Sequence, residues 1–97
     1  MSERFRELKD ATASALLRGP GAARSELREA CAQGKVPDEL ALLVEKIDRH
    51  AYRVTDEDLA ALRAKYSEDE LFEIIAAAAF GAADRRLRAG LRALEDA

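Results

Sequence analysis

The chain has 97 residues, the length of a single domain, and a formal net charge of −3 at pH 7. This acidic balance argues against binding to nucleic acid or to an anionic membrane, because both require a concentrated positive surface. The one cysteine excludes an internal disulfide and a zinc site built from several cysteines. We therefore expect one domain, 1–97, with no metal and no cofactor.

The start of the chain, "MSERFRELKD", is charged from the outset and lacks the apolar core of a signal peptide. No apolar stretch is long enough to span a bilayer. These two features predict a protein of the reducing cytoplasm without membrane association.

The spacing of apolar residues predicts an all-α fold, a compact bundle of about five helices, because the alternation typical of strands is missing. We expect the first helix over residues 2–18 and the second over 22–33, an N-terminal helical pair that fills 1–34. The first helix gathers on one face Phe5, Leu8, Ala11, Ala15 and Leu16. The second directs inward Ala23, Leu27, Ala30 and Cys31.

The third helix begins near Pro37, a residue suited to a first helical turn, and has the 3.6-residue stripe of a core-facing helix. Its apolar positions are Leu40, Leu43, Val44, Ile47 and Ala51, with Val54 beyond them. Two capping boxes follow, Thr55 with Asp58 and Ser67 with Glu70. They predict a short fourth helix over 56–65 and a long fifth helix over 68–94.

The fifth helix contains "IIAAAAFGAA", Ile74 to Ala83, which is apolar on all sides and therefore predicts burial on all sides. A glycine inside a helix costs about 1 kcal/mol relative to alanine, so Gly81 indicates close packing of backbones. We expect this segment to pack in the core and across an interface between subunits, through Ala78, Phe80, Gly81 and Ala82.

The segment from Pro37 to Leu94 resembles the carboxymuconolactone decarboxylase and alkylhydroperoxidase D-like superfamily. The similarity is best in "KYSEDELFEIIAAAAFGAADRRLRAGLRAL", Lys65 to Leu94, where members carry a cap, an acid, an "FE"-like step and an Ala-rich helix. Phe72 and Glu73 fit the "FE" step. The resemblance covers 37–97 and implies an all-helical fold whose members form oligomers through those helices.

The peroxidase branch of that superfamily carries an acid followed by a Cys-x-x-Cys-x-x-x-His motif. Aligned without gaps, the acid falls on Asp38, the two cysteines on His50 and Arg53, and the histidine on Glu57. Thiol chemistry requires a thiolate and a resolving cysteine, and neither is present there. A cysteine peroxidase is therefore rejected, although members of the decarboxylase branch need no cysteine pair.

The stretch "RHAYRVTDED", Arg49 to Asp58, has two interpretations. On a continuous helix, His50, Arg53 and Glu57 would share one face and could serve as acid-base, carboxylate-binding and orienting groups, with Asp38 and Tyr52 as candidate binding residues. Alternatively, the cap at Thr55 breaks that face. His50 then lies in a last helical turn, where the dipole favours positive charge, and Glu57 is a first-turn acid. We favour the second interpretation.

Three other features also have ordinary structural explanations. Cys31 fits a small buried apolar side chain better than a redox sensor. The acids at 56–58 and 68–70 suit helix starts and lack the spacing of a calcium loop. The arginines between Asp84 and Arg92 suit a solvated helix end better than an anion site.

These observations predict a non-thiol, non-catalytic protein of the carboxymuconolactone decarboxylase-like kind, a homo-oligomeric binding or structural protein. Two alternatives stay open. One is a non-thiol decarboxylase-like enzyme that acts on a small organic acid through His50, Arg53 and Glu57. The other is a helical adaptor that binds another protein through an apolar groove.

Overall fold

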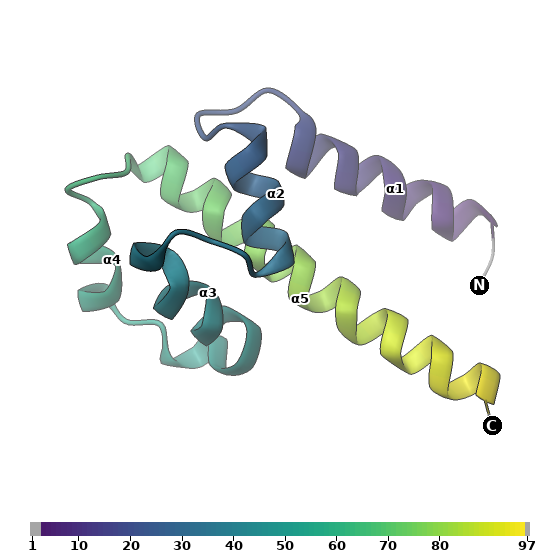
Figure 1. Cartoon of the computed structure of the whole chain (residues 1–97). Coiled ribbons are helices and arrows are strands. Elements are labelled where there is room, and N and C mark those ends of the chain that lie inside the picture. The colour runs from purple at the N-terminus through teal and green to yellow at the C-terminus, as the bar shows by residue number, and fades with distance from the viewer. Residues whose placement is uncertain (1–2, 97) are drawn as a thin grey trace.

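A computed structural model describes residues 3–96, without the side chain of Tyr52. The elements in chain order are α1 (Glu3–Arg18), α2 (Ser25–Gln33), α3 (Asp38–His50), the 3-10 helix η1 (Ala51–Arg53), α4 (Asp56–Leu62) and α5 (Glu68–Asp96). The described residues contain no strand. The predicted all-α fold with five helices and a long C-terminal helix is therefore confirmed (Figure 1).

The long helix α5 organises the molecule. Helices α2 and α3 both pack on it, in front of it in the view of Figure 1. Helix α1 runs antiparallel to the C-terminal half of α5, so that the two ends of the chain lie at the same end of the molecule (Figure 1). The overall dimensions are 46 × 28 × 19 Å, and α5 follows the long dimension, since a 29-residue helix is about 43 Å long.

The core lies where α2, α3 and α5 meet. Helix α3 buries Leu40, Leu43, Val44 and Ile47, the stripe that its spacing predicts. Helix α5 contributes buried side chains on the facing side, Leu71, Ile74, Ala77 and Ala78. Ala51 is exposed, because α3 ends at His50 and the chain tightens into η1.

Both predicted capping boxes form. The Thr55 hydroxyl accepts a hydrogen bond from the Asp58 backbone N–H at 3.3 Å, and the Asp58 carboxylate accepts one from the Thr55 N–H at 2.9 Å. Ser67 and Glu70 repeat the exchange at 3.1 and 2.9 Å. Each box satisfies backbone donors that a helix start leaves without a partner, so α4 and α5 begin where the sequence predicts.

The closest helix contact joins α2 to α5 at Gly81. A Cβ atom built on Gly81 would lie 1.9 Å from the carbonyl oxygen of Ala32, which belongs to the backbone of α2. The same carbonyl accepts a hydrogen bond of 2.6 Å from Arg85, one turn further along α5. The close backbone packing predicted for Gly81 therefore exists, and its partner is α2 of the same chain.

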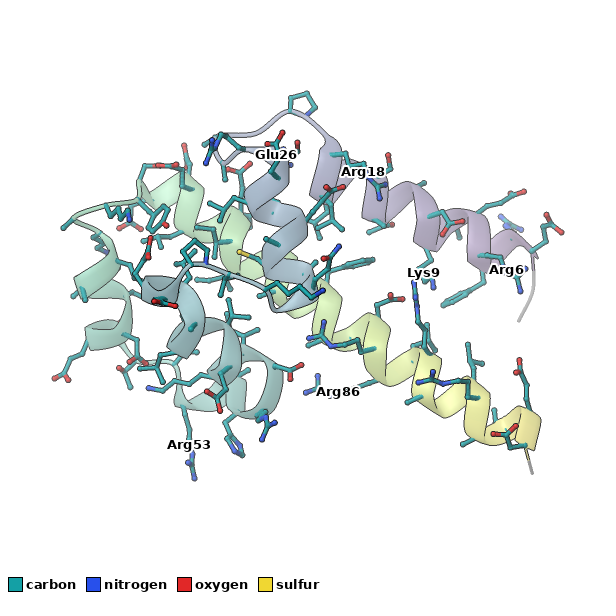
Figure 2. The ribbon with its side chains drawn as sticks, viewed as in Figure 1. Arg6, Lys9, Arg18, Glu26, Arg53 and Arg86 are labelled. Atoms are coloured by element: carbon teal, nitrogen blue, oxygen red, sulfur yellow. The ribbon has the colours of Figure 1, made fainter. Side chains whose placement is uncertain are left out.

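The apolar face predicted for α1 is mostly exposed, although Leu16 at its end packs against the core. Phe5 is 45% exposed and Leu8 is 61% exposed, and Ala11 and Ala15 are exposed as well. The one buried residue of the described part of α1 is Leu17. From α1, Lys9 points toward α5 (Figure 2) and forms an ion pair of 3.1 Å with Asp84.

The connection between α1 and α2 is held by two charged side chains. Arg28 is only 4% exposed, and its guanidinium donates hydrogen bonds to the carbonyls of Leu16, at 2.9 Å, and of Gly19. From α5, the Glu73 carboxylate accepts hydrogen bonds from the backbone N–H groups of Ala22 and Ala23 at 3.1 and 2.9 Å. Helix α2 accordingly starts at Ser25, later than predicted.

Candidate functional site

The structure separates His50, Arg53 and Glu57. His50 ends α3 with backbone angles outside the helical region (φ −147°, ψ 61°), Arg53 ends η1, and Glu57 lies in the first turn of α4. All three side chains are exposed, and that of Arg53 points away from the body of the molecule (Figure 2). The continuous helical face that a catalytic triple would need is therefore absent, as the cap at Thr55 predicts.

One cavity includes a residue of the triple, and its wall is acidic. It measures about 200 Å³ and includes Glu57 in its wall, together with Glu39, Asp58, Leu42 and Leu62. His50 and Arg53 do not line it. A site for a carboxylate substrate would require positive charge, so this wall does not suit an organic acid.

The two candidate binding residues belong to different helices. Asp38 is the first residue of α3, where its exposed carboxylate suits the positive end of the helix dipole. Tyr52 belongs to η1, and its side chain lies outside the described part of the chain. The prediction that these residues bind a ligand stays a prediction.

Cys31 is fully buried in the core between α2 and α5. Burial raises the pKa of its thiol from 9.0 to about 11. The reactive thiolate is therefore scarce near neutral pH. The environment of Cys31 agrees with a packing role and opposes thiol chemistry.

A cluster that the sequence does not signal joins α3 to the start of α5. The Glu39 carboxylate accepts hydrogen bonds from the Lys65 ammonium at 2.6 Å and from the Tyr66 hydroxyl at 3.0 Å. The hydrogen bond from Lys65, with further ones from its own backbone and Tyr66, lowers the pKa of Glu39 from 4.5 to about 2. Lys65 and Tyr66 follow Glu39 by 26 and 27 positions in the sequence, so no local pattern could have predicted the cluster.

Acid is expected to destabilise the fold through such carboxylates. Hydrogen bonds from Lys46 and Arg85 also lower the pKa of Asp58 and of Asp48. A carboxyl whose folded-state pKa is depressed stabilises the fold above its unfolded pKa, and that contribution disappears as the pH falls through the folded pKa. The urea midpoint is therefore expected to decline between about pH 5 and pH 2.

The variant Glu39→Gln tests this expectation, because it removes one of the depressed carboxyls. Its urea midpoint should be lower than that of the parent at pH 7 and should decline less between pH 5 and pH 2. Glu45→Gln, on an exposed part of α3, is the matched control. If the urea midpoints of the parent and of Glu39→Gln declined equally with pH, the depressed pKa of Glu39 would be contradicted.

A cavity of about 380 Å³ lies between α1, α2 and α5. Leu17, Phe80 and Gly81 form its apolar wall, and Arg85 and Arg88 stand at its polar side. Both arginines already have partners. Arg85 binds Asp48 at 2.8 Å, and Arg88 binds Asp84 at 3.0 Å. A small acid would have to displace these contacts, so the cavity offers no ready anion site.

The residues predicted to form a subunit interface divide into two groups. Ala78, Gly81 and Ala82 are buried within one chain, on the side of α5 that carries the contact with α2. Their burial therefore requires no second subunit. Phe80 is half-buried, packs against the core and lines the cavity between α1 and α5.

The opposite side of α5 carries a second apolar surface, here called the outer face. At 100° per residue its members fall on one side of the helix. They are Phe72, Ala76, Ala79, Ala83, Leu87, Gly90 and Leu94. Phe72 is 73% exposed and Leu94 is 74% exposed, Ala79 and Ala83 are exposed, and Ala76 and Leu87 are half-buried. Helix α5 is thus apolar on two sides, of which one packs in the core and the other faces solvent.

Other types of site find no support in the described part of the chain. Between residues 3 and 96, no three His, Cys, Asp or Glu side chains gather in a way that could hold a metal ion. No helix in this range combines the length and the apolar character needed to cross a membrane.

No family model, curated protein or solved structure matches the chain. The resemblance to the carboxymuconolactone decarboxylase-like superfamily therefore stays a prediction from the residues quoted above.

Proposed function

We propose that the chain is a non-thiol, non-catalytic protein of the carboxymuconolactone decarboxylase-like kind that acts as a homo-oligomeric binding or structural protein. The observation that carries this proposal is the outer face of α5. Exposed apolar patches that continue along an element are typical of association surfaces. This surface extends from Phe72 to Leu94, a distance of about 33 Å at 1.5 Å per residue.

Two further observations support a role without catalysis. The fully buried Cys31, with a pKa of about 11, offers no nucleophile near neutral pH. The candidate triple of His50, Arg53 and Glu57 is divided among three elements and shares no cavity wall. An enzyme needs such groups within reach of one substrate.

Light scattering over a range of protein concentrations tests the proposal. The parent is expected to show the mass of an oligomer, and Phe72→Glu is expected to weaken association by about 30-fold, because it replaces a large apolar side chain of the contact with a charge. Leu42→Glu is the matched control, since Leu42 is a large exposed apolar residue on α3. Circular dichroism verifies that both variants remain helical.

The parent must associate for the proposal to hold. A parent that stays monomeric at every concentration would contradict it and would favour the adaptor, whose exposed helix face binds a different protein. Equal loss of association in Leu42→Glu and Phe72→Glu would contradict the assignment of the outer face.

A further inference from the structure

The charges of α5 are segregated along its length. Its first six residues contain four acids and no base, namely Glu68, Asp69, Glu70 and Glu73. The stretch 85–92 contains four arginines and no acid, namely Arg85, Arg86, Arg88 and Arg92. Two such helices side by side in parallel would place like charges together, whereas an antiparallel pair places the acidic block beside the arginine block. Most of these arginines lie on the other side of α5, and the charges next to the outer face are Glu68 and Asp69 at one end and Arg86 at the other. Only an antiparallel pair brings these opposite charges together.

The sizes of the outer-face residues indicate where two such helices would cross. The middle of the face is small, with Ala76, Ala79 and Ala83, and it is flanked by Phe72 and Leu87. Small side chains let two helix backbones approach, and larger ones on either side fill the space where the helices diverge. Ala79 lies next to the midpoint between Phe72 and Leu87, and also next to the midpoint between the two charged blocks.

We propose that two copies of the chain pair through the outer faces of their α5 helices, antiparallel, with the helices crossing beside Ala79. Phe72 of each copy then packs against Leu87 of the partner subunit. This inference rests on the proposed homo-oligomeric function and names the surface and the geometry. It describes a two-fold contact, in which the same patch of each copy serves both sides.

Glu68 and Arg86 flank this contact on the same side of the helix. They are 18 positions apart, which is five turns at 3.6 residues per turn. In an antiparallel pair, residues on the same flank face each other across the two-fold axis. Glu68 now pairs with Arg63 at 2.7 Å, and the Arg86 guanidinium donates a hydrogen bond to the Asp48 carbonyl. Both contacts are exposed, and exposed ion pairs contribute little, so Glu68 can exchange Arg63 for Arg86 of the partner subunit.

Disulfide trapping distinguishes the possible geometries. Ala79→Cys places a thiol at the crossing point, where two Cα atoms can come within the roughly 7 Å that a disulfide requires. Gly90→Cys places a thiol on the same face but about 11 residues away, which separates the two copies by about 30 Å in an antiparallel pair. Ala89→Cys, exposed on another side of α5, is the control for the face. The parent, with only the buried Cys31, is the control for adventitious oxidation.

After mild oxidation, Ala79→Cys is expected to double in mass on a non-reducing gel, while Gly90→Cys, Ala89→Cys and the parent stay at monomer mass. Trapping of Gly90→Cys together with Ala79→Cys would indicate parallel helices and overturn the inference. An oligomeric parent whose Ala79→Cys variant is not trapped would overturn the inference and leave the proposed function standing. A monomeric parent would contradict both the inference and the proposed function.

Discussion

Replacement of Gly81 with alanine is expected to lower the free energy of unfolding by about 3 kcal/mol, because overpacked sites cost roughly this much. The added Cβ would lie 1.9 Å from the Ala32 carbonyl oxygen and 2.6 Å from its carbon. These are backbone atoms of α2, so no flexible side chain can move aside. Helices α2 and α5 would have to separate, and the core between them would lose contacts. Gly81→Leu is expected to lower the free energy of unfolding further, because its side chain is larger.

Gly90→Ala is the matched control for this substitution. Gly90 also lies inside α5, but a Cβ atom there would meet nothing within 4 Å. Alanine at that position is expected to stabilise the fold by about 0.5 to 1 kcal/mol through its helix propensity. Urea unfolding at a fixed protein concentration measures the change in stability of Gly81→Ala and of Gly90→Ala. Similar effects of the two variants would refute the claim that α2 closely approaches Gly81.

Leu40→Ala is expected to destabilise the fold by about 2 to 5 kcal/mol. Leu40 is fully buried in the core between α3 and α5. Removal of its side chain costs both the burial of the lost atoms and the cavity that they leave. For a small domain whose total stability is about 5 to 15 kcal/mol, this loss populates the unfolded state substantially.

Leu42→Ala removes the same atoms two residues away. Leu42 is 59% exposed, and the expected change in stability is within about 0.5 kcal/mol. The difference in urea midpoint between the two variants therefore isolates burial from helix propensity. If Leu42→Ala were as damaging as Leu40→Ala, the packing of α3 described above would be incorrect.

The parts of the fold that sequence analysis predicted correctly are those set by neighbours along the chain. The capping boxes at Thr55 and Ser67 involve residues three positions apart, so their pattern is visible without a structure. The apolar stripe of α3 works in the same way, because it depends on helical spacing alone. The break between His50 and Glu57 followed from the first of these caps.

The side of α5 that faces the core could not be predicted locally. The segment Ile74 to Ala83 is apolar on all sides, so its pattern leaves the choice to tertiary contacts. Ala78, Gly81 and Ala82, which we expected at a subunit interface, are buried within the chain, with α2 against Gly81. Ala79 and Ala83 are exposed. The exposure of Leu8 was missed for a related reason, because helical spacing alone does not show which side of α1 meets α5.

Long-range polar contacts left no trace in the sequence either. Arg28 and Glu73 hold the connection before α2, but they are 45 positions apart and neither belongs to a recognisable motif. The Glu39 cluster with Lys65 and Tyr66 is equally remote. Side chains of this kind satisfy backbone groups that the fold buries, and only the fold shows which groups those are.

The contact between Gly81 and Ala32 also fixes the register of two helices that are distant in sequence. Sliding α2 along α5 by one turn would bring the Ala32 carbonyl against Ala77 or Arg85, and each of these carries the Cβ atom that Gly81 lacks. Arg85 reinforces this choice, because its hydrogen bond to the Ala32 carbonyl forms only in the observed alignment. A single glycine and an arginine one turn later thus select one packing of an alanine-rich helix that would otherwise accept several.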